Sequence, residues 1–371
     1  PRSAPARVAR AMAEWREQLI GGWNRAGWME MPERLGARIA ALIGAPPDSV
    51  VVGETLTIRI FQLLGAALAL RPGRKVVLSD SGNFPSDLYA AQALIEGLGQ
   101  GHELRVVAPE AVEAAIAEAG EALAVLMLTE VDYRTGRRHD MARLTARAHE
   151  VGALTLWDLA HSAGAIRVDL TAAGADFAAG CTYKFLNGGP GAPAFAYLRP
   201  DLAGRAAPLL VGWLGHAEPF AFAPDWRPAS GAAGLRIGTP PVLQMAALEA
   251  ALEIWDGIDL AALEARAGAL GDRLIAAVRA RCPELALASP ARAAERGAQV
   301  SFRHPEGYAV MQALIARGVV GDFRAPDIIR FGITPLYVGE AEIDRAADTL
   351  AEVLATRAWD RPEYRRRQRV T

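Results

Sequence analysis

Lysine and cysteine are both scarce in this 371-residue sequence. Lys75 and Lys184 are the only lysines among 40 basic residues, and Cys181 and Cys282 are the only cysteines. Two cysteines cannot build a disulfide framework, so a reducing compartment such as the cytoplasm is expected. No apolar run reaches the roughly 18 residues of a membrane-spanning helix, so a membrane is not an expected partner.

An excess of charge of either sign is also missing. The sequence holds 40 basic and 42 acidic residues, with a formal net charge of −2 at pH 7. Without a basic balance, nucleic acid is not an expected partner. The six histidines and two cysteines show no metal-ligand spacing, so no metal site is expected.

Short apolar runs alternate with helical patterns from Val50 onward, which is typical of a parallel sheet covered by helices on both faces. The alternation predicts an α/β fold with seven strands. These strands are Val50–Val52, Lys75–Ser79, Leu104–Val107, Leu123–Leu128, Leu154–Trp157, Phe177–Cys181 and Ala194–Leu198. The intervening helices are predicted over Thr57–Leu70, Pro85–Leu98, Pro109–Ala119 and Met141–Val151.

The pattern changes near Pro240 and Pro241. A long helical region over Val242–Arg281 is predicted there, followed by alternating strands and helices up to Trp359. We therefore expect a large domain over residues 46–244 and a smaller α+β domain built from residues 1–45 and 245–371.

Two predicted strands end in residues that can carry chemistry. Asp158 directly follows the strand Leu154–Trp157, and Lys184 follows Phe177–Cys181. Sites in open parallel sheets form beyond the carboxyl ends of the strands, so these two side chains can meet at one edge. Arginine cannot replace lysine where chemistry needs a deprotonated amine, which sets Lys184 apart in an arginine-rich chain.

A lysine and an aspartate so placed suit pyridoxal 5'-phosphate (PLP). A partly desolvated Lys184 amine can form a Schiff base with PLP, and Asp158 can keep the pyridine nitrogen protonated. The alternative is a lysine that covers the core with its stem and pairs with a buried aspartate, without chemistry. Lys75 lies at the end of an Arg-Pro-Gly-Arg turn and is expected at the surface.

A phosphate group needs backbone donors, and Gly53–Thr57 offers them between a predicted strand and a predicted helix. The same segment can also be an ordinary helix N-cap. Phe84 begins the next helix and can stack on a pyridine ring, or it can act as a hydrophobic staple.

Several longer segments resemble kynureninase, a PLP enzyme of the aminotransferase class V superfamily, in its bacterial type. They are Asn83–Tyr89, Trp157–Gly164, Thr182–Gly189, Gly212–His216, Arg236–Pro241 and Arg330–Tyr337. The resemblance implies the fold-type-I PLP-dependent transferase fold, with a mostly parallel seven-stranded sheet between helices and a smaller α+β domain. The sequence begins at Pro1, and the Gly-Asn-Ser-Leu-Gly segment that family members carry before this point is not in it.

The resemblance also implies roles for single residues. Lys184 would bind PLP covalently, Asp158 would bind its pyridine nitrogen, and Tyr183 would act as an acid or base. Further cofactor contacts are implied for Leu56, Thr57, Phe84, Pro85, Ser86, Asp87, Thr129 and His161. Trp213 and Thr239 are expected to reach the cofactor phosphate of the neighbouring subunit, which requires a homodimer with shared sites. Arg330 would bind the substrate carboxylate, and Trp23 with Thr239 would recognise its aryl end.

The implied activity is hydrolytic cleavage of the Cβ–Cγ bond of L-kynurenine to anthranilate and L-alanine, with weaker action on 3-hydroxykynurenine. Such an enzyme serves tryptophan catabolism or NAD biosynthesis. A cysteine desulfurase-like lyase and an aminotransferase of the same superfamily are the alternatives, and a catalytically inactive PLP-fold binding protein is a third. A desulfurase needs a thiol on a mobile loop, whereas Cys181 lies in a predicted strand and Cys282 near a helix end.

Overall fold

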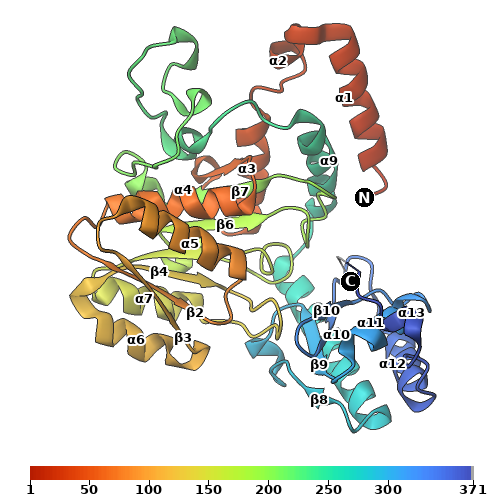
Figure 1. The fold of residues 1–371 in the computed structure, drawn as a ribbon. Coiled ribbons are helices and arrows are strands. Elements are labelled where there is room, and N and C mark those ends of the chain that lie inside the picture. Colours follow the sequence, from red (N-terminus) through yellow and green to blue (C-terminus); the bar gives the residue numbers. More distant parts are fainter. Residues whose placement is uncertain (369–371) are drawn as a thin grey trace. The chain divides into compact units, whose positions relative to one another are not determined.

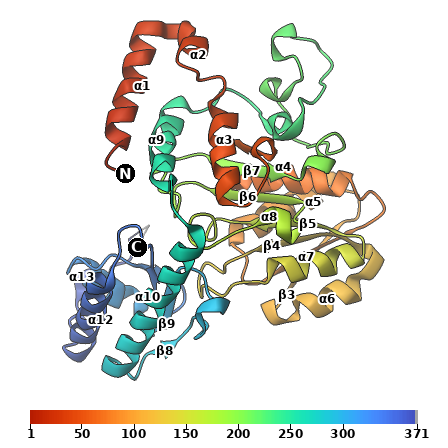
Figure 2. The same ribbon diagram turned by 180° about the vertical axis from the view of Figure 1, so that it is seen from behind.

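The computed structural model describes residues 1–368 (Figures 1 and 2). Its contacts divide the chain into two units. Unit 1 comprises Pro1–Glu130 and Asp140–Ile258, and unit 2 comprises Val131–His139 and the chain from Asp259 onward. Residues 1–45 and 245–258 thus group with the large sheet, unlike in the predicted domains. Contacts do not measure independent folding, so the predicted domain boundaries stay a prediction.

Unit 1 is built on a seven-stranded sheet, as the alternating apolar runs predict. Its strands in spatial order are β1 (Val50–Val52), β7 (Ala194–Leu198), β6 (Phe177–Cys181), β5 (Leu154–Asp158), β4 (Leu123–Thr129), β2 (Val76–Asp80) and β3 (Glu103–Val107). Strand β7 runs antiparallel to both β1 and β6, and the pairs from β6 to β3 are parallel. The α/β fold class with a mostly parallel sheet is confirmed.

Helices bury both faces of this sheet. They are α4 (Leu56–Ala69), α5 (Pro85–Leu98), α6 (Val112–Ala119), α7 (Met141–Glu150) and the short α8 (Leu170–Ala173). Leu156 packs in one core cluster with residues of α4 and α5. Its neighbour Trp157 points to the opposite face, where its Nε1 donates to Thr145 Oγ1 of α7 at 3.1 Å. Successive strand residues point to opposite faces, which explains why the central strands are mostly apolar along their whole length, whereas the edge strand β3 carries Glu103 and Arg105.

The remaining helices of unit 1 come from both ends of the sequence. They are α1 (Ala4–Gln18), α2 (Gly22–Arg25), α3 (Met31–Leu42) and α9 (Val242–Leu252). Glu249 of α9 joins them, because it accepts hydrogen bonds from Arg7 and Arg34, both at 2.6 Å. Two segments far apart in the sequence therefore pack together, which groups residues 1–45 with the sheet.

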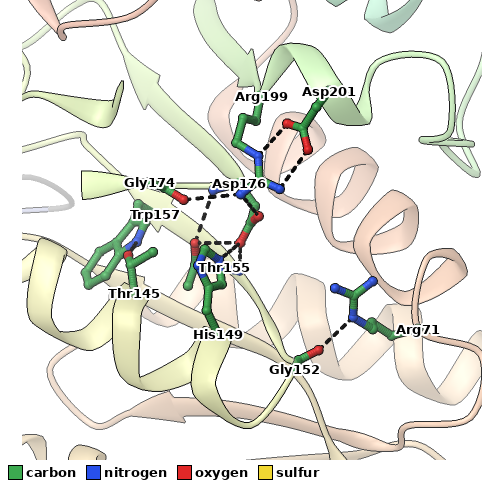
Figure 3. Close-up of polar contacts among 10 residues, drawn as sticks. All are labelled: Arg71, Thr145, His149, Gly152, Thr155, Trp157, Gly174, Asp176, Arg199 and Asp201. Carbon is green, nitrogen blue, oxygen red and sulfur yellow. Dashed lines mark hydrogen bonds and ion pairs between the residues drawn. The ribbon is translucent and has the colours of Figure 1, made fainter. Parts of the chain in front are cut away.

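A buried polar cluster lies at the amino ends of β5 and β6 (Figure 3). Asp176 is fully buried, and its Oδ2 accepts hydrogen bonds from the Thr155 backbone N–H at 2.8 Å and the Thr155 hydroxyl at 3.1 Å. His149 Nε2 lies 2.8 Å from the same oxygen, and Arg199 Nη1 lies 2.7 Å from Oδ1. The cluster gives the buried Asp176 carboxylate its polar partners. It lies at the amino ends of these strands, whereas Asp158 and Lys184 lie at their carboxyl ends.

Unit 2 contains a four-stranded antiparallel sheet and the helices that pack with it. The strand order is β10 (Asp322–Arg324), β11 (Ile328–Gly332), β9 (Gln299–Arg303) and β8 (Ala286–Leu287). The helices are α10 (Leu260–Arg281), α11 (Gly307–Ile315), α12 (Glu340–Ala355) and α13 (Pro362–Arg365). Among residues 1–368, none of the helices combines the length and apolar character that crossing a membrane requires.

The helical region expected over Val242–Arg281 consists of two separate helices, α9 and α10. Gly257 between them adopts a φ of +79°, which favours glycine and ends the helical path. Asp259 then begins α10 as its N-cap, and its Oδ1 accepts from the N–H of Ala261 at 2.8 Å and Ala262 at 3.2 Å.

Candidate active site

A cavity of about 400 Å³ lies at the carboxyl ends of β1, β5 and β6 in unit 1. Seven of the predicted site residues line it: Leu56, Thr57, Phe84, Ser86, Asp158, Tyr183 and Lys184. They come from four separate parts of the sequence, which the parallel sheet brings to one edge. Asp158 and Lys184 therefore meet, as the strand ends predict.

One wall of the cavity is the start of α4, a helix of 14 residues. Its N-cap Thr55 makes no capping hydrogen bond through its side chain. The first backbone N–H groups of a helix have no partner within the helix and favour an anion. The hydroxyls of Thr55 and Thr57 line the same cavity, so this wall has the donors that a phosphate group requires.

Two carboxyl groups lie together beneath the cavity. Asp158 is 2% exposed, and its Oδ1 accepts a hydrogen bond from the Ala160 backbone N–H at 2.8 Å. Burial raises the pKa of Asp158, while the Lys184 ammonium and the Ala160 N–H oppose that shift. Asp87 is fully buried, and burial together with the Asp158 carboxylate raises its pKa well above the usual range. Burial and the neighbouring carboxylate thus favour the protonated form of Asp87, whereas the Lys184 ammonium and the Ala160 N–H favour the ionised form of Asp158.

Aromatic rings flank the Lys184 amine. Its Nζ lies 5.8 Å from the centre of the Phe84 ring and 5.6 Å from that of Tyr183. Both rings are partly exposed, at 38% for Phe84 and 50% for Tyr183. Phe84 also begins α5 as its N-cap, so its ring is held at the cavity by the backbone of that helix.

The donors and acceptors of this cavity suit PLP. Asp158 offers an anion for a protonated pyridine nitrogen, Lys184 an amine, and α4 a cradle for phosphate. Four further predicted cofactor contacts lie beside the cavity without lining it: Pro85, Asp87, Thr129 and His161. Thr129 ends β4 next to Asp158, and His161 is buried in the turn that follows β5.

Trp213 and Thr239 do not line the Lys184 cavity. Thr239 lines a second cavity of about 280 Å³ in unit 1, together with Trp15, Trp23 and Trp28. The Trp23 and Trp28 rings meet edge to face, with centres 5.8 Å apart. The structure therefore brings together Trp23 and Thr239, the two residues predicted to recognise the aryl end of the substrate.

Trp213 belongs to a separate, exposed aromatic cluster. Its ring stacks on Phe222 with centres 6.4 Å apart and meets Phe220 edge to face at 5.7 Å. Trp213, Phe220 and Phe222 are 43%, 61% and 76% exposed. A cluster of three exposed aromatic rings is typical of a surface that another molecule covers.

Arg330 lies in unit 2, on β11, and is 8% exposed. Its Nε donates to Asp322 Oδ1 at 2.7 Å, and its Nη2 binds the other oxygen of the same carboxylate. Its Nη1 donates to the Tyr133 carbonyl. Within unit 2, the guanidinium of Arg330 therefore pairs with the Asp322 carboxylate.

Several cavity residues carry no signal of their own in the sequence. Ala160, Cys181, Gly191, Ala192 and Ala194 line the cavity. Four of them are small and chemically silent, and only the sheet topology places them there. Burial raises the pKa of the Cys181 thiol, so this sulfur stays protonated and is a poor nucleophile.

Comparison with known proteins places this geometry in a family. Residues 263–350 match the kynureninase C-terminal domain family. A kynureninase from Pseudomonas fluorescens is 48% identical over 377 residues, covering 99% of this chain and 90% of the relative. A kynureninase from Burkholderia mallei (strain SAVP1) is 46% identical over 383 residues, covering 100% of this chain and 90% of the relative.

Solved structures share the fold at lower sequence identity. A cysteine desulfurase from Thermococcus onnurineus NA1 superposes with a TM-score of 0.79 at 18% identity, covering 96% of this chain and 92% of that one. A C-DES mutant with glycine covalently linked to its PLP cofactor gives a TM-score of 0.77 at 19% identity, with 95% and 93% coverage. The full-length identity to the two bacterial relatives shows that this chain belongs to the kynureninase family.

Proposed function

We propose that the chain hydrolyses L-kynurenine to anthranilate and L-alanine, and that it acts more weakly on 3-hydroxykynurenine. Membership of the kynureninase family supports a PLP-dependent hydrolase that acts on a carbon–carbon bond. The observation that carries the assignment in this chain is the meeting of Lys184 and Asp158 in one cavity beside an uncapped helix start.

Bound PLP supplies an electron sink for the pair of electrons that is left when a bond at the substrate carbon breaks. Asp158, buried and close to Lys184, would in its ionised form hold a proton on the pyridine nitrogen and so keep that sink effective. The start of α4, with Leu56 and Thr57, would bind the phosphate, and the Phe84 ring would cover the pyridine ring.

Lys184 would bind the cofactor through its amine. Its Nζ lies beside Phe84, the residue proposed to cover the pyridine ring, so the same amine would then be placed to move the substrate α-proton. The Tyr183 hydroxyl is the neighbouring proton donor for hydration of the substrate carbonyl and for release of the aryl product. The partial exposure of Tyr183 gives water access to that step.

Arg330 would bind the substrate carboxylate through its fork of N–H groups. In the structure Asp322 holds that fork, so a substrate carboxylate would take the place of Asp322. Arg324 Nη2 already lies 3.2 Å from Asp322 Oδ2 and would keep that carboxylate paired after the exchange.

A homodimer with shared active sites is part of the proposal. Trp213 and Thr239 line no part of their own Lys184 cavity, and the aromatic cluster around Trp213 is exposed. Met12, Trp15, Leu19 and Ile20 on and beside α1 are exposed as well, at 45% to 82%. A second copy of the chain that covers these surfaces would bring Trp213 and Thr239 to its partner's cofactor phosphate.

We also propose a cytoplasmic location. Both cysteines of the chain are free and buried in the structure, which suits a reducing compartment.

Incubation of the purified protein with L-kynurenine tests the function through anthranilate fluorescence. The matched variant Lys184→Ala should lose turnover and the long-wavelength absorbance of the lysine-bound cofactor. Lys75→Ala is the control, because it removes the other lysine and should keep both. A Lys184→Ala protein that retains turnover and absorbance would overturn the assignment. Amino transfer to an added keto acid without anthranilate would instead favour an aminotransferase.

A further inference from the structure

Arg59 and Gln62 form a buried polar pair on α4 that the proposed chemistry does not use. Arg59 is 1% exposed and Gln62 is fully buried. The Arg59 guanidinium donates to carbonyl oxygens instead of a carboxylate. Burial lowers the pKa of Arg59 to about 10, while the nearby charge of Glu54 opposes the shift. Burying a charged guanidinium costs free energy of folding unless its N–H groups find partners. The partners of Arg59 therefore indicate what the residue holds in place.

The first contact of Arg59 holds the loop between β1 and α4. Its Nε donates to the Gly53 carbonyl at 3.1 Å. The approach is close, since a Cβ at Gly53 would lie 2.9 Å from Arg59 Nη2. The next residue, Glu54, adopts a left-handed φ of +60°, so the loop needs support to keep its shape. This loop leads directly into Leu56 and Thr57 at the wall of the Lys184 cavity.

The second group of contacts holds two distant segments. Arg59 Nη1 donates to the Leu235 carbonyl at 2.6 Å and to Gln62 Oε1 at 2.8 Å. Gln62 Nε2 donates to the carbonyls of Leu235 at 3.0 Å and Leu210 at 2.9 Å. Leu210 and Leu235 directly precede the segments that carry Trp213 and Thr239.

The two segments are also fastened to each other. The Leu214 N–H donates to the Ile237 carbonyl at 3.3 Å. Gly212 approaches the same carbonyl so closely that a Cβ there would lie 2.1 Å from its oxygen. A shift of one segment therefore moves the other, and Arg59 with Gln62 is the connection from both to the cavity loop.

We propose that Arg59 and Gln62 are positioning residues that couple the two active sites of the dimer, by joining the cofactor loop of one site to the segments that serve the partner's site. The proposal rests on the shared sites of the proposed function. A fully hydrogen-bonded buried network of this kind transmits a displacement, because each broken bond leaves an unsatisfied group. Binding of the cofactor phosphate at one site should thus change the affinity of the other.

Heterodimers in which only one subunit keeps Lys184 test the coupling. The measured quantity is the dissociation constant of PLP, obtained from the absorbance of the lysine-bound cofactor. In the first heterodimer, Arg59→Met is in the subunit that keeps Lys184. In the second, Arg59→Met is in the partner that carries Lys184→Ala. Both should bind PLP at least about fivefold more weakly than the heterodimer with Arg59 intact in both subunits. Weakening in the first heterodimer alone would overturn the coupling, and so would unchanged affinity in both.

Gln62→Met provides a second variant that keeps the bond from Arg59 to Gly53. It should weaken PLP binding only when it is placed in the partner that carries Lys184→Ala. An equal loss in either placement would indicate general loosening of α4 and overturn the proposal. Arg296→Met is the control, because Arg296 is a buried arginine of unit 2 that also binds two carbonyls, of Pro290 at 2.8 Å and Ala291 at 3.2 Å, in addition to the Asp272 carboxylate at 2.7 Å. It should leave PLP binding unchanged in both placements.

The shared site itself is tested separately. Thr239→Val in the subunit that carries Lys184→Ala should weaken PLP binding at the partner's intact site. If it does so while Arg59→Met in the same subunit has no effect, the coupling fails and the shared site stands. If neither has an effect, the shared site fails and the coupling with it, while anthranilate formation by the unmodified protein still reports on the proposed reaction.

Discussion

The two buried carboxyls beneath the Lys184 cavity should respond very differently to the same substitution. We expect the negative charge of the pair on Asp158 and the proton on Asp87, since burial and the neighbouring Asp158 raise the pKa of Asp87 well above its usual range, whereas the Lys184 ammonium opposes the shift at Asp158. Asn is uncharged and nearly the same size as Asp. Asp158→Asn therefore removes an ion, whereas Asp87→Asn replaces one neutral group by another.

The expected magnitudes follow from what each group loses. Removing one partner of a buried charged pair costs about 3–5 kcal/mol. Where the loss of this ion pair falls on the transition state, at about 1.4 kcal/mol for each factor of ten, Asp158→Asn should lower kcat by roughly a hundred- to several thousandfold. Asp87→Asn gives up at most one neutral hydrogen bond, worth about 0.5–1.5 kcal/mol, so its loss should stay near tenfold or below.

Anthranilate fluorescence at saturating PLP measures both losses, and the absorbance of the bound cofactor shows that each variant is loaded. The ratio between the two variants is the decisive quantity. Equal losses, or a larger loss for Asp87→Asn, would show that the charge is shared or lies on Asp87 and would refute the reasoning.

The same assignment has a consequence for stability against pH. An unfolded aspartate has a pKa of about 3.9, so the unfolded chain releases a proton that folded Asp87 retains. The contribution of Asp87 to stability is then greatest below about pH 4 and falls as the pH rises toward the raised pKa of folded Asp87. Urea unfolding of the cofactor-free protein should show a smaller loss between pH 5 and pH 8 in Asp87→Asn than in the unmodified chain. Identical losses would contradict a protonated Asp87.

Three further predictions concern other parts of the chain. Asp176→Asn should cost about 3 kcal/mol, at the low end for a buried pair because Arg199 keeps Asp201, with contacts at 2.5 and 3.0 Å. Thermal unfolding should shift by roughly 4–6 °C, and an equal shift in the exposed control Asp201→Asn would contradict this. Asp322→Asn should lower KM for kynurenine about fivefold at constant kcat. The ion pair between Asp322 and Arg330, which competes with the substrate carboxylate, is partly exposed and worth about 1 kcal/mol, and Arg330 keeps its bond to Tyr133. A raised KM would mean that Asp322 orients Arg330 instead. Cys181→Ala should keep anthranilate formation within about threefold, because its buried thiol stays protonated, and a hundredfold loss would show that the sulfur takes part.

Much of unit 1 could be predicted because all of its strands except the edge strand β3 are buried on both faces. The run Leu123–Leu128 is apolar without interruption, and Leu154–Trp157 is interrupted only by Thr155 before it ends in Asp158, which marks both the strand and its carboxyl end. The meeting of Asp158 with Lys184 follows from that rule alone. The antiparallel direction of β7 has no such signal, because a buried strand looks alike in either direction.

The missed features depend on contacts between distant residues. Strand β10 is only three residues long and contains Asp322 and Arg324, so its composition is that of a loop. It is a strand because it pairs with β11, and this pairing also sets Asp322 opposite Arg330. The proton of Asp87 depends in the same way on its burial beside Asp158, which no local pattern of α5 reveals.

Because lysine is so scarce, the chemical state of Lys184 can be followed by lysine-specific cleavage of the chain. A protease that cuts only after lysine would divide the denatured chain into three fragments, residues 1–75, 76–184 and 185–371. Reduction of the cofactor bond with borohydride would convert the Lys184 amine into a bulky secondary amine that such a protease does not recognise. The second cut would then disappear, and a gel would report the occupied fraction of Lys184 in any variant. Few chains of this length allow the state of one active-site residue to be read from fragment sizes alone.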